Sequence, residues 1–161
     1  MAKYPLLFTL RRKVSGDDYL ADITAHGRAL ATQEVDGSWW IYGVQPGALA
    51  GTGSTLLEAY TDFRRTFTAV LYDTAHSAAS FWAFKEAVGR FFDETDGVTV
   101  QEWLDAVTEV RAGRVTAKDI PLGPNGIRQE SAESPRYITV ECIKKFRSAD
   151  NVLDPTVAVA A

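Results

Sequence analysis

The chain has 161 residues, 46% of them apolar and 24% charged, which is ordinary usage for one globular domain. A net charge of −4 argues against a protein that grips phosphate backbones. Its one cysteine, Cys142, excludes an intrachain disulfide, and we expect it to be a small core residue. The sequence shows no signal-peptide pattern and no apolar run long enough to cross a membrane, so we expect a cytoplasmic protein.

The first third of the chain has the alternating apolar and polar pattern of β-strands. Turn residues separate the strands: Ser15–Asp18 between the first two, and Asp36-Gly37, a strong hairpin signal, before the aromatic strand. His26-Gly27 is expected to interrupt the second strand. The predicted strands are Leu6–Val14, Tyr19–Thr24, Ala29–Val35, Ser38–Val44 and a short Ala48–Thr52.

The strand Ser38–Val44 is apolar on both faces. Alternation places Trp39, Ile41 and Gly43 on one face and Trp40, Tyr42 and Val44 on the other. We therefore expect both faces to be covered, one by the domain's own helix and the other by a second helix or a partner subunit.

A long amphipathic helix is predicted to follow. Thr55 is placed as its N-cap, Glu58 completes a capping box, and the helix should end near Tyr72–Thr74. Apolar residues repeat at helical spacing over Leu56, Tyr60, Phe63, Phe67 and Val70.

Two more helices and a final strand are predicted in the rest of the chain. The second helix covers Ser77–Phe92, with an inner face of Phe81, Phe84, Val88 and Phe91. The third runs from a capping box of Thr99 and Glu102 to about Arg111, with Trp103, Leu104, Val107 and Val110 inside. A long Gly- and Pro-rich loop, Ala112–Arg136, precedes a strand at Tyr137–Phe146 and a mobile tail, Asp150–Ala161.

These elements predict an α+β fold: a mainly antiparallel sheet of three to five strands, with a long helix on one face and additional C-terminal helices. Residues 1–111 form the core, including an N-terminal hairpin. Residues 112–161 supply the loop, the last strand and the tail.

No catalytic, metal-binding or cofactor-binding residues are predicted, so we expect a protein that is not an enzyme. His26 and His76 lack ligand partners at suitable spacing, and the acidic clusters Asp17-Asp18 and Asp93-Glu94 with Asp96 read as surface turns. Gly51-Thr52-Gly53 precedes a helix N-terminus that could bind an anion, but the rest of a nucleotide motif is missing.

Nucleic-acid binding is not evident from the charge pattern. The basic clusters are Arg11–Lys13, Arg64-Arg65 and Lys144-Lys145 with Arg147, and such runs are usually solvated surface. A helix-turn-helix at Thr99–Ile120 would need Val115–Ile120 as recognition helix, which is short and is stopped by Pro121.

One segment, roughly Ala29–Tyr72, resembles the HicB-like antitoxin family. The resemblance is carried by the strand before Asp36-Gly37, the aromatic strand, the Pro46-Gly47 bend and the helix start Gly53–Ala59, which fits a G-x-T-x-x-E-A pattern. It implies a degraded ribonuclease-H-like fold without catalytic carboxylates. It also implies binding and masking of a small toxin that cleaves mRNA. Many members carry a C-terminal DNA-binding module, for which the residues after the shared helix show no counterpart.

The resulting functional expectation is a non-catalytic interaction protein of the antitoxin type, with Trp40 and Tyr42 as weak candidates for partner contacts, since aromatics anchor interfaces. Exposed edge strands make a homodimer reasonable. The alternative is a bacterial small-molecule or nucleic-acid binding module with a pocket lined by Trp39, Trp40 or Trp82.

Overall fold

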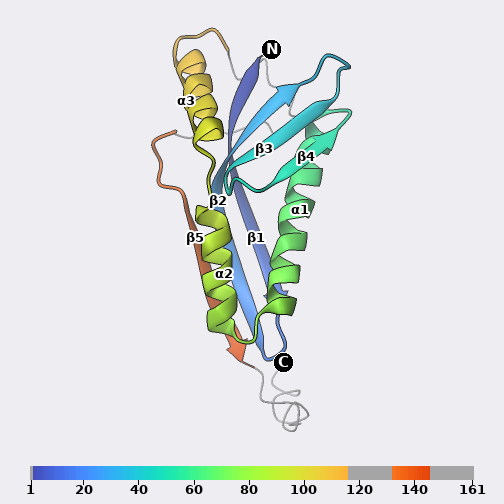
Figure 1. Ribbon diagram of the computed structural model, residues 1–161, viewed down its shortest axis with the longest axis vertical. Coiled ribbons are helices and arrows are strands. Elements are labelled where there is room, and N and C mark those ends of the chain that lie inside the picture. The colour runs from blue at the N-terminus through green and yellow to red at the C-terminus, as the bar shows by residue number, and fades with distance from the viewer. Residues whose placement is uncertain (1, 116–131, 146–161) are drawn as a thin grey trace.

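A computed structural model describes residues 2–115 and 132–145 as an α+β fold (Figure 1). The strands are β1 (Lys3–Ser15), β2 (Tyr19–Gln33), β3 (Trp39–Gln45), β4 (Ala50–Gly53) and β5 (Tyr137–Lys145). The helices are α1 (Leu56–Ser77), α2 (Phe81–Asp93) and α3 (Gly97–Arg111). The predicted fold class, an antiparallel sheet with one long helix and further helices after it, is confirmed.

The sheet is organised around the long strand β2. β1 pairs with β2 antiparallel over its whole length, as expected for the N-terminal hairpin. On the other side β2 has two neighbours in succession: β5 borders Tyr19–His26, and β3 borders Arg28–Gln33. β4 pairs with β3 and completes the order β1-β2-β3-β4.

The predicted interruption at His26-Gly27 is wrong, because β2 is one continuous strand that ends at Gln33 rather than Val35. Gly27 is required by packing and not by a turn. A Cβ atom added there would lie 2.5 Å from the Phe8 ring and 2.5 Å from the Gln45 carbonyl oxygen. His26 therefore lies within a strand and not in a turn.

Helix α1 begins where predicted. The Glu58 backbone N–H donates to Thr55 Oγ1 at 3.1 Å, so Thr55 is the N-cap. The Glu58 carboxylate accepts from the Ser54 backbone N–H at 2.9 Å, and a backbone hydrogen bond from Thr55 also lowers its pKa, in keeping with the predicted capping box. The helix also continues to Ser77, beyond the predicted end. Its fully buried stripe is Leu56, Ala59, Phe63, Phe67, Leu71 and Ala75.

The second helix begins at Phe81 rather than at Ser77, and the third begins at Gly97 with a cap other than the predicted Thr99. Ser80 caps α2, and Asp96 caps α3 by accepting from the Thr99 backbone N–H at 3.2 Å. The Thr99 hydroxyl donates to the same carboxylate, so Thr99 supports the cap instead of forming it. The buried faces are Phe81, Phe84, Val88 and Phe92 in α2, and Trp103, Ala106 and Val107 in α3.

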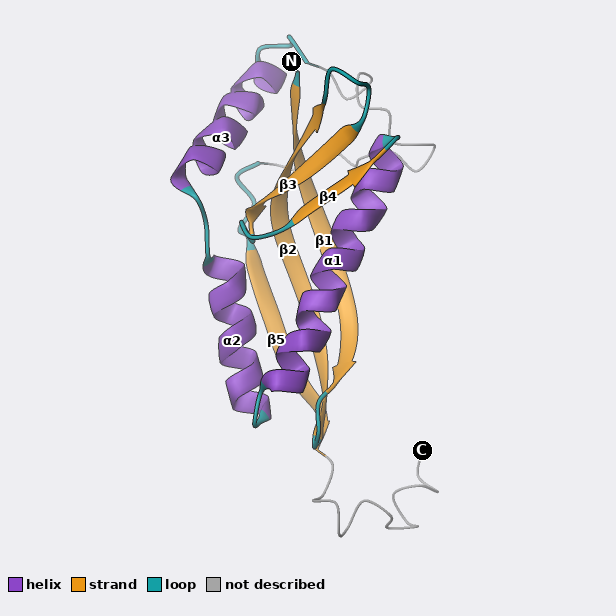
Figure 2. Cartoon of the chain, turned by 45° about the vertical axis from the view of Figure 1, so that its right-hand side comes forward, coloured by secondary structure: helices purple, strands orange, loops and turns teal. Residues whose placement is uncertain are grey.

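The two faces of the sheet are covered differently. α1 and α2 pack on one face and form the main core with side chains such as Phe8, Ile23 and Ile41. α3 packs on the opposite face, where Trp103 and Ala106 meet Leu30 and Val44. Figures 1 and 2 show α2 and α3 following one another along one side of the molecule and α1 along the other. The link between α2 and α3 is held at the Pro46-Gly47 bend, where Gly47 N–H donates to the Glu94 carbonyl at 2.9 Å.

Some sequence predictions fall outside the described residues. They are Phe146 at the predicted end of the last strand, the tail Asp150–Ala161, most of the loop Ala112–Arg136 and most of the Val115–Ile120 segment. In the part of the chain that is described, no helix is long and apolar enough to cross a membrane.

Candidate functional site

Trp40 and Tyr42, the residues predicted to contact a partner, lie together on the face of β3 turned away from α1. Their rings are stacked, with centroids 5.9 Å apart and planes inclined by 11°. The alternate residues Trp39 and Ile41 point into the main core, as predicted. α3 covers Val44 at the end of the strand, whereas Trp40 is only partly buried and Tyr42 is 39% exposed.

We call Trp40 and Tyr42 the aromatic platform. Across the sheet they lie opposite Thr32 and Leu30 of β2, so their backbone positions are fixed by the central strand. Stacked rings on a rigid sheet present apolar area at little cost in side-chain entropy. On this second face of β3, α3 covers Val44, and the covering of Trp40 and Tyr42 by a partner subunit stays a prediction.

Several donors of the glycine-rich turn before α1 are already bonded to carboxylates. The Thr52 backbone N–H donates to Asp62 Oδ2 at 3.0 Å, and the Ser54 backbone N–H and hydroxyl donate to Glu58. The hydrogen bonds from the Ser54 hydroxyl and backbone N–H lower the pKa of Glu58, and the ionised carboxylate disfavours a second negative charge at this place. Gly51 serves close packing instead, because a Cβ atom there would lie 2.4 Å from the Phe63 backbone nitrogen.

The candidate titratable residues do not assemble into a catalytic or metal site in the described ranges. His76 lies in the last turn of α1, and Asp96 acts as a helix cap whose pKa is lowered by its hydrogen bonds from Thr99. Cys142 is partly buried against the main core. Within residues 2–115 and 132–145, no group of three or more His, Cys, Asp or Glu side chains is placed to hold a metal ion.

A second surface, which the sequence did not predict, lies on the α3 side of β1, β2 and β5, beyond the reach of α3. We call it the open face. The register of the strands sets its side chains in rows: Thr9, His26 and Tyr137, then Arg11, Thr24 and Thr139, then Lys13, Asp22 and Glu141.

The first row of the open face is ordered by side-chain contacts. His26 Nδ1 and Thr9 Oγ1 are 3.1 Å apart, and the His26 and Tyr137 ring centroids are 4.7 Å apart. The alternation of Thr9, Arg11 and Lys13 with buried residues could have indicated a solvent-facing row in β1. The contribution of Tyr137 depends on a pairing between distant parts of the chain, for which the sequence offers no local signal.

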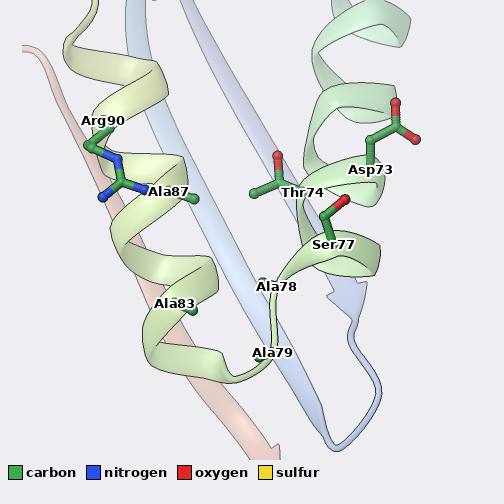
Figure 3. A pocket seen from close by; sticks show the side chains of 8 residues that line it. All are labelled: Asp73, Thr74, Ser77, Ala78, Ala79, Ala83, Ala87 and Arg90. Atoms are coloured by element: carbon green, nitrogen blue, oxygen red, sulfur yellow. The ribbon is translucent and has the colours of Figure 1, made fainter.

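A shallow groove lies between the end of α1 and the start of α2 (Figure 3). Its lining comes from both helices and their connection: Asp73, Thr74, Ser77, Ala78, Ala79, Ala83, Ala87 and Arg90. Alanine methyls dominate it, and Arg90 is already paired with Glu86 at 3.1 Å. It therefore lacks the convergent polar groups of a ligand site. Trp39, Trp40 and Trp82 do not line it: Trp39 is buried in the main core, Trp40 lies on the other face of β3, and Trp82 is exposed on α2.

The described geometry defines an α+β protein with an exposed aromatic pair on one sheet face. Comparison of the chain with protein-family models, with curated proteins and with solved structures finds no match. Function must therefore be argued from the chain's own surfaces.

Proposed function

We propose that this protein is a non-catalytic interaction protein that binds and masks a partner enzyme, in the manner that its resemblance to HicB antitoxins implies. The observation that carries the proposal is the aromatic platform: Trp40 and Tyr42 are stacked, partly exposed and held on a rigid strand. Anchors of this kind dominate protein–protein binding energy. The partner would be a small basic enzyme that cleaves mRNA, which suits the chain's net charge of −4.

The test begins with identification of a partner. The tagged chain is purified from its native host, any small basic protein that accompanies it is identified, and the pair is measured by calorimetry. The double variant Trp40→Ala/Tyr42→Ala should weaken binding by about 30-fold or more, the loss of roughly 2 kcal/mol expected for an interface anchor. The purified chain should also inhibit RNA cleavage by the partner.

Tyr72→Ala is the matched control, because Tyr72 is 50% exposed but lies on α1, away from the aromatic platform. It should leave binding unchanged. If the double variant binds as tightly as the unmodified chain while keeping its circular dichroism spectrum, the platform is not the interface. If no small basic protein accompanies the chain, the antitoxin role is lost.

A second candidate function is binding of single-stranded nucleic acid on the open face. The observation that favours it is the His26–Tyr137 pair beside Arg11, since bases stack on such rings and arginine contacts phosphate. Asp22 and Glu141 in the third row oppose it. An anisotropy titration with a labelled single-stranded RNA separates the candidates, because the masking function predicts no binding by the isolated chain.

A homodimer is also part of the proposed function. Its interface is distinct from the aromatic platform.

A further inference from the structure

Among the strands in the described ranges, β1, β4 and β5 are at an edge of the sheet, and the edges of β1 and β4 are blocked. On β1, Arg64 Nη1 donates to the Thr9 carbonyl at 2.8 Å, and Arg12 Nη1 donates to the Arg11 carbonyl at 2.8 Å. Pro5 has no N–H to offer on the same side of the strand. On β4, the Thr52 N–H is bonded to Asp62, and α1 lies directly against the strand at Gly51. Proteins commonly protect edges in these ways against pairing.

No described strand pairs with the third edge, that of β5. The Thr9 carbonyl points away from β2. Because the backbone N–H and C=O groups of successive residues point to opposite sides of a strand, those of Leu10 point toward β2, and those of its partner Ala25 point toward β1. Thr24 and His26 then bond to Thr139 and Tyr137 of β5. The backbone groups of Ile138, Val140 and Cys142 consequently point outward, and no other described residue forms a backbone hydrogen bond with them.

Apolar side chains flank this open edge on both faces. Tyr137 and Ile143 are about half exposed beside the open face. On the core side, the flank of α2 turned away from α1 carries Trp82, which is 67% exposed, with Lys85 over its ring. Gly89 lies on the same flank and has nothing within 4 Å of an added Cβ atom, which leaves room for a neighbour. An open backbone edge with exposed apolar side chains is the arrangement expected for strand addition.

We propose that this edge joins two copies of the chain, with β5 of one pairing antiparallel to β5 of the other about a two-fold axis at Val140. The strand is self-complementary in that register. Tyr137 faces Ile143 of the second copy, Ile138 faces Cys142, and Thr139 faces Glu141. Aromatic–β-branched pairs of this kind stabilise sheets. A two-fold axis at Glu141 would place the Glu141 carboxylates of the two copies opposite each other, and their repulsion disfavours that register.

The first test is the oligomeric state of the full chain by sedimentation velocity at micromolar concentration. The unmodified protein should sediment as a dimer, a species with twice the 17.7 kDa mass of the chain. Ile143→Asp should convert it to the monomer by placing a charge beside the seam. Leu57→Asp is the matched control, because Leu57 is 56% exposed against 50% for Ile143 but lies on α1. It should leave the dimer intact.

The second test fixes the register by crosslinking. Thr139→Cys/Glu141→Cys places cysteines at facing, non-hydrogen-bonded positions, about 4.5 Å apart between Cα atoms. Oxidation should yield a covalent dimer on a non-reducing gel. Thr9→Cys/Arg11→Cys carries the same spacing on the same face at the blocked edge of β1, and should stay monomeric on the gel.

A monomeric unmodified chain would overturn the proposal. So would a dimer that survives Ile143→Asp and fails to crosslink through residues 139 and 141. Neither result bears on partner masking, because the aromatic platform is on a different strand from β5.

Discussion

The two halves of β2 share one strand and one backbone geometry, yet they are buried differently. From Tyr19 to Arg28 buried residues alternate with half-buried ones, whereas Ala29, Leu30, Ala31 and Thr32 are buried in succession. The difference follows from the second face of the sheet: α3 covers it at Leu30 and Val44, and no described helix covers the open face. A strand covered on both faces loses its alternation and reads as a continuous apolar run. The change from alternating to continuous burial along β2 thus indicates where α3 packs on the sheet.

The same difference separates structural from functional surfaces. The doubly covered half holds β3 rigidly, so the aromatic platform at its margin is presented on a fixed support. In the singly covered half, no described helix covers the three rows of polar side chains, and no described strand pairs with the β5 edge. Surfaces available to partners therefore lie where the second layer of helices stops.

The largest effect should come from Leu30→Ala. Leu30 is 1% exposed beneath α3, so truncation should cost about 2–5 kcal/mol of unfolding free energy through lost burial and a cavity. Thr24→Ala changes the same face of the same strand where no described helix covers it, and should stay within about 0.5 kcal/mol. Urea unfolding measures both. Equal costs would mean that the two halves of β2 are not covered differently.

A smaller effect on stability is expected from replacing two glycines, Gly51 and Gly89, that differ in how closely they are packed. Gly51→Ala places a methyl group 2.4 Å from the Phe63 backbone nitrogen, and forcing α1 away from β4 should cost roughly 1–3 kcal/mol. Gly89→Ala in α2 meets no atom within 4 Å and should stabilise the protein by up to about 1 kcal/mol through helix propensity. Thermal unfolding of the two variants should shift in opposite directions. A stable Gly51→Ala variant would contradict the close contact between α1 and β4.

The sequence predicted those elements whose signals are local. Strand alternation placed Trp39 and Ile41 inside, and helical spacing identified Phe63 and Phe67 as core residues of α1. The errors arose where two local signals competed. Gly27 reads as a strand breaker but serves packing against Phe8, and Thr99 reads as a helix cap but donates to the true cap, Asp96.

The candidate surfaces were predictable to different degrees for the same reason. Trp40 and Tyr42 share a face of one strand, so alternation alone put them together. His26 and Tyr137 meet only because β5 returns to β2 from the far end of the chain. Recognising β5 as the unblocked edge also requires that pairing, together with the contacts by which α1 blocks the edges of β1 and β4. No short segment of the sequence predicts a pairing between strands as distant in the chain as β2 and β5.

The smallest effect concerns the cap of α3, the helix that makes one half of β2 doubly covered. Hydrogen bonds from the Thr99 hydroxyl and backbone N–H lower the pKa of Asp96. A carboxyl group whose pKa is lowered by folding contributes stability above its unfolded pKa, near pH 4, and loses it as pH falls through the folded value. Asp96→Asn keeps a good capping side chain but cannot ionise. Its unfolding free energy should therefore decline less steeply below about pH 5 than that of the unmodified chain.

Urea unfolding at several pH values between 3 and 7 measures this difference. Thr99→Val removes the hydroxyl that donates to Asp96 while leaving the carboxylate in place, so its pH dependence should fall between those of the unmodified chain and Asp96→Asn. The slopes of the three curves should become equal at the acidic end, where the carboxyl group is neutral in both states. Parallel curves would show that the Asp96 carboxylate does not hold the start of α3. The covering of Leu30 would then depend on the packing of Trp103, Ala106 and Val107.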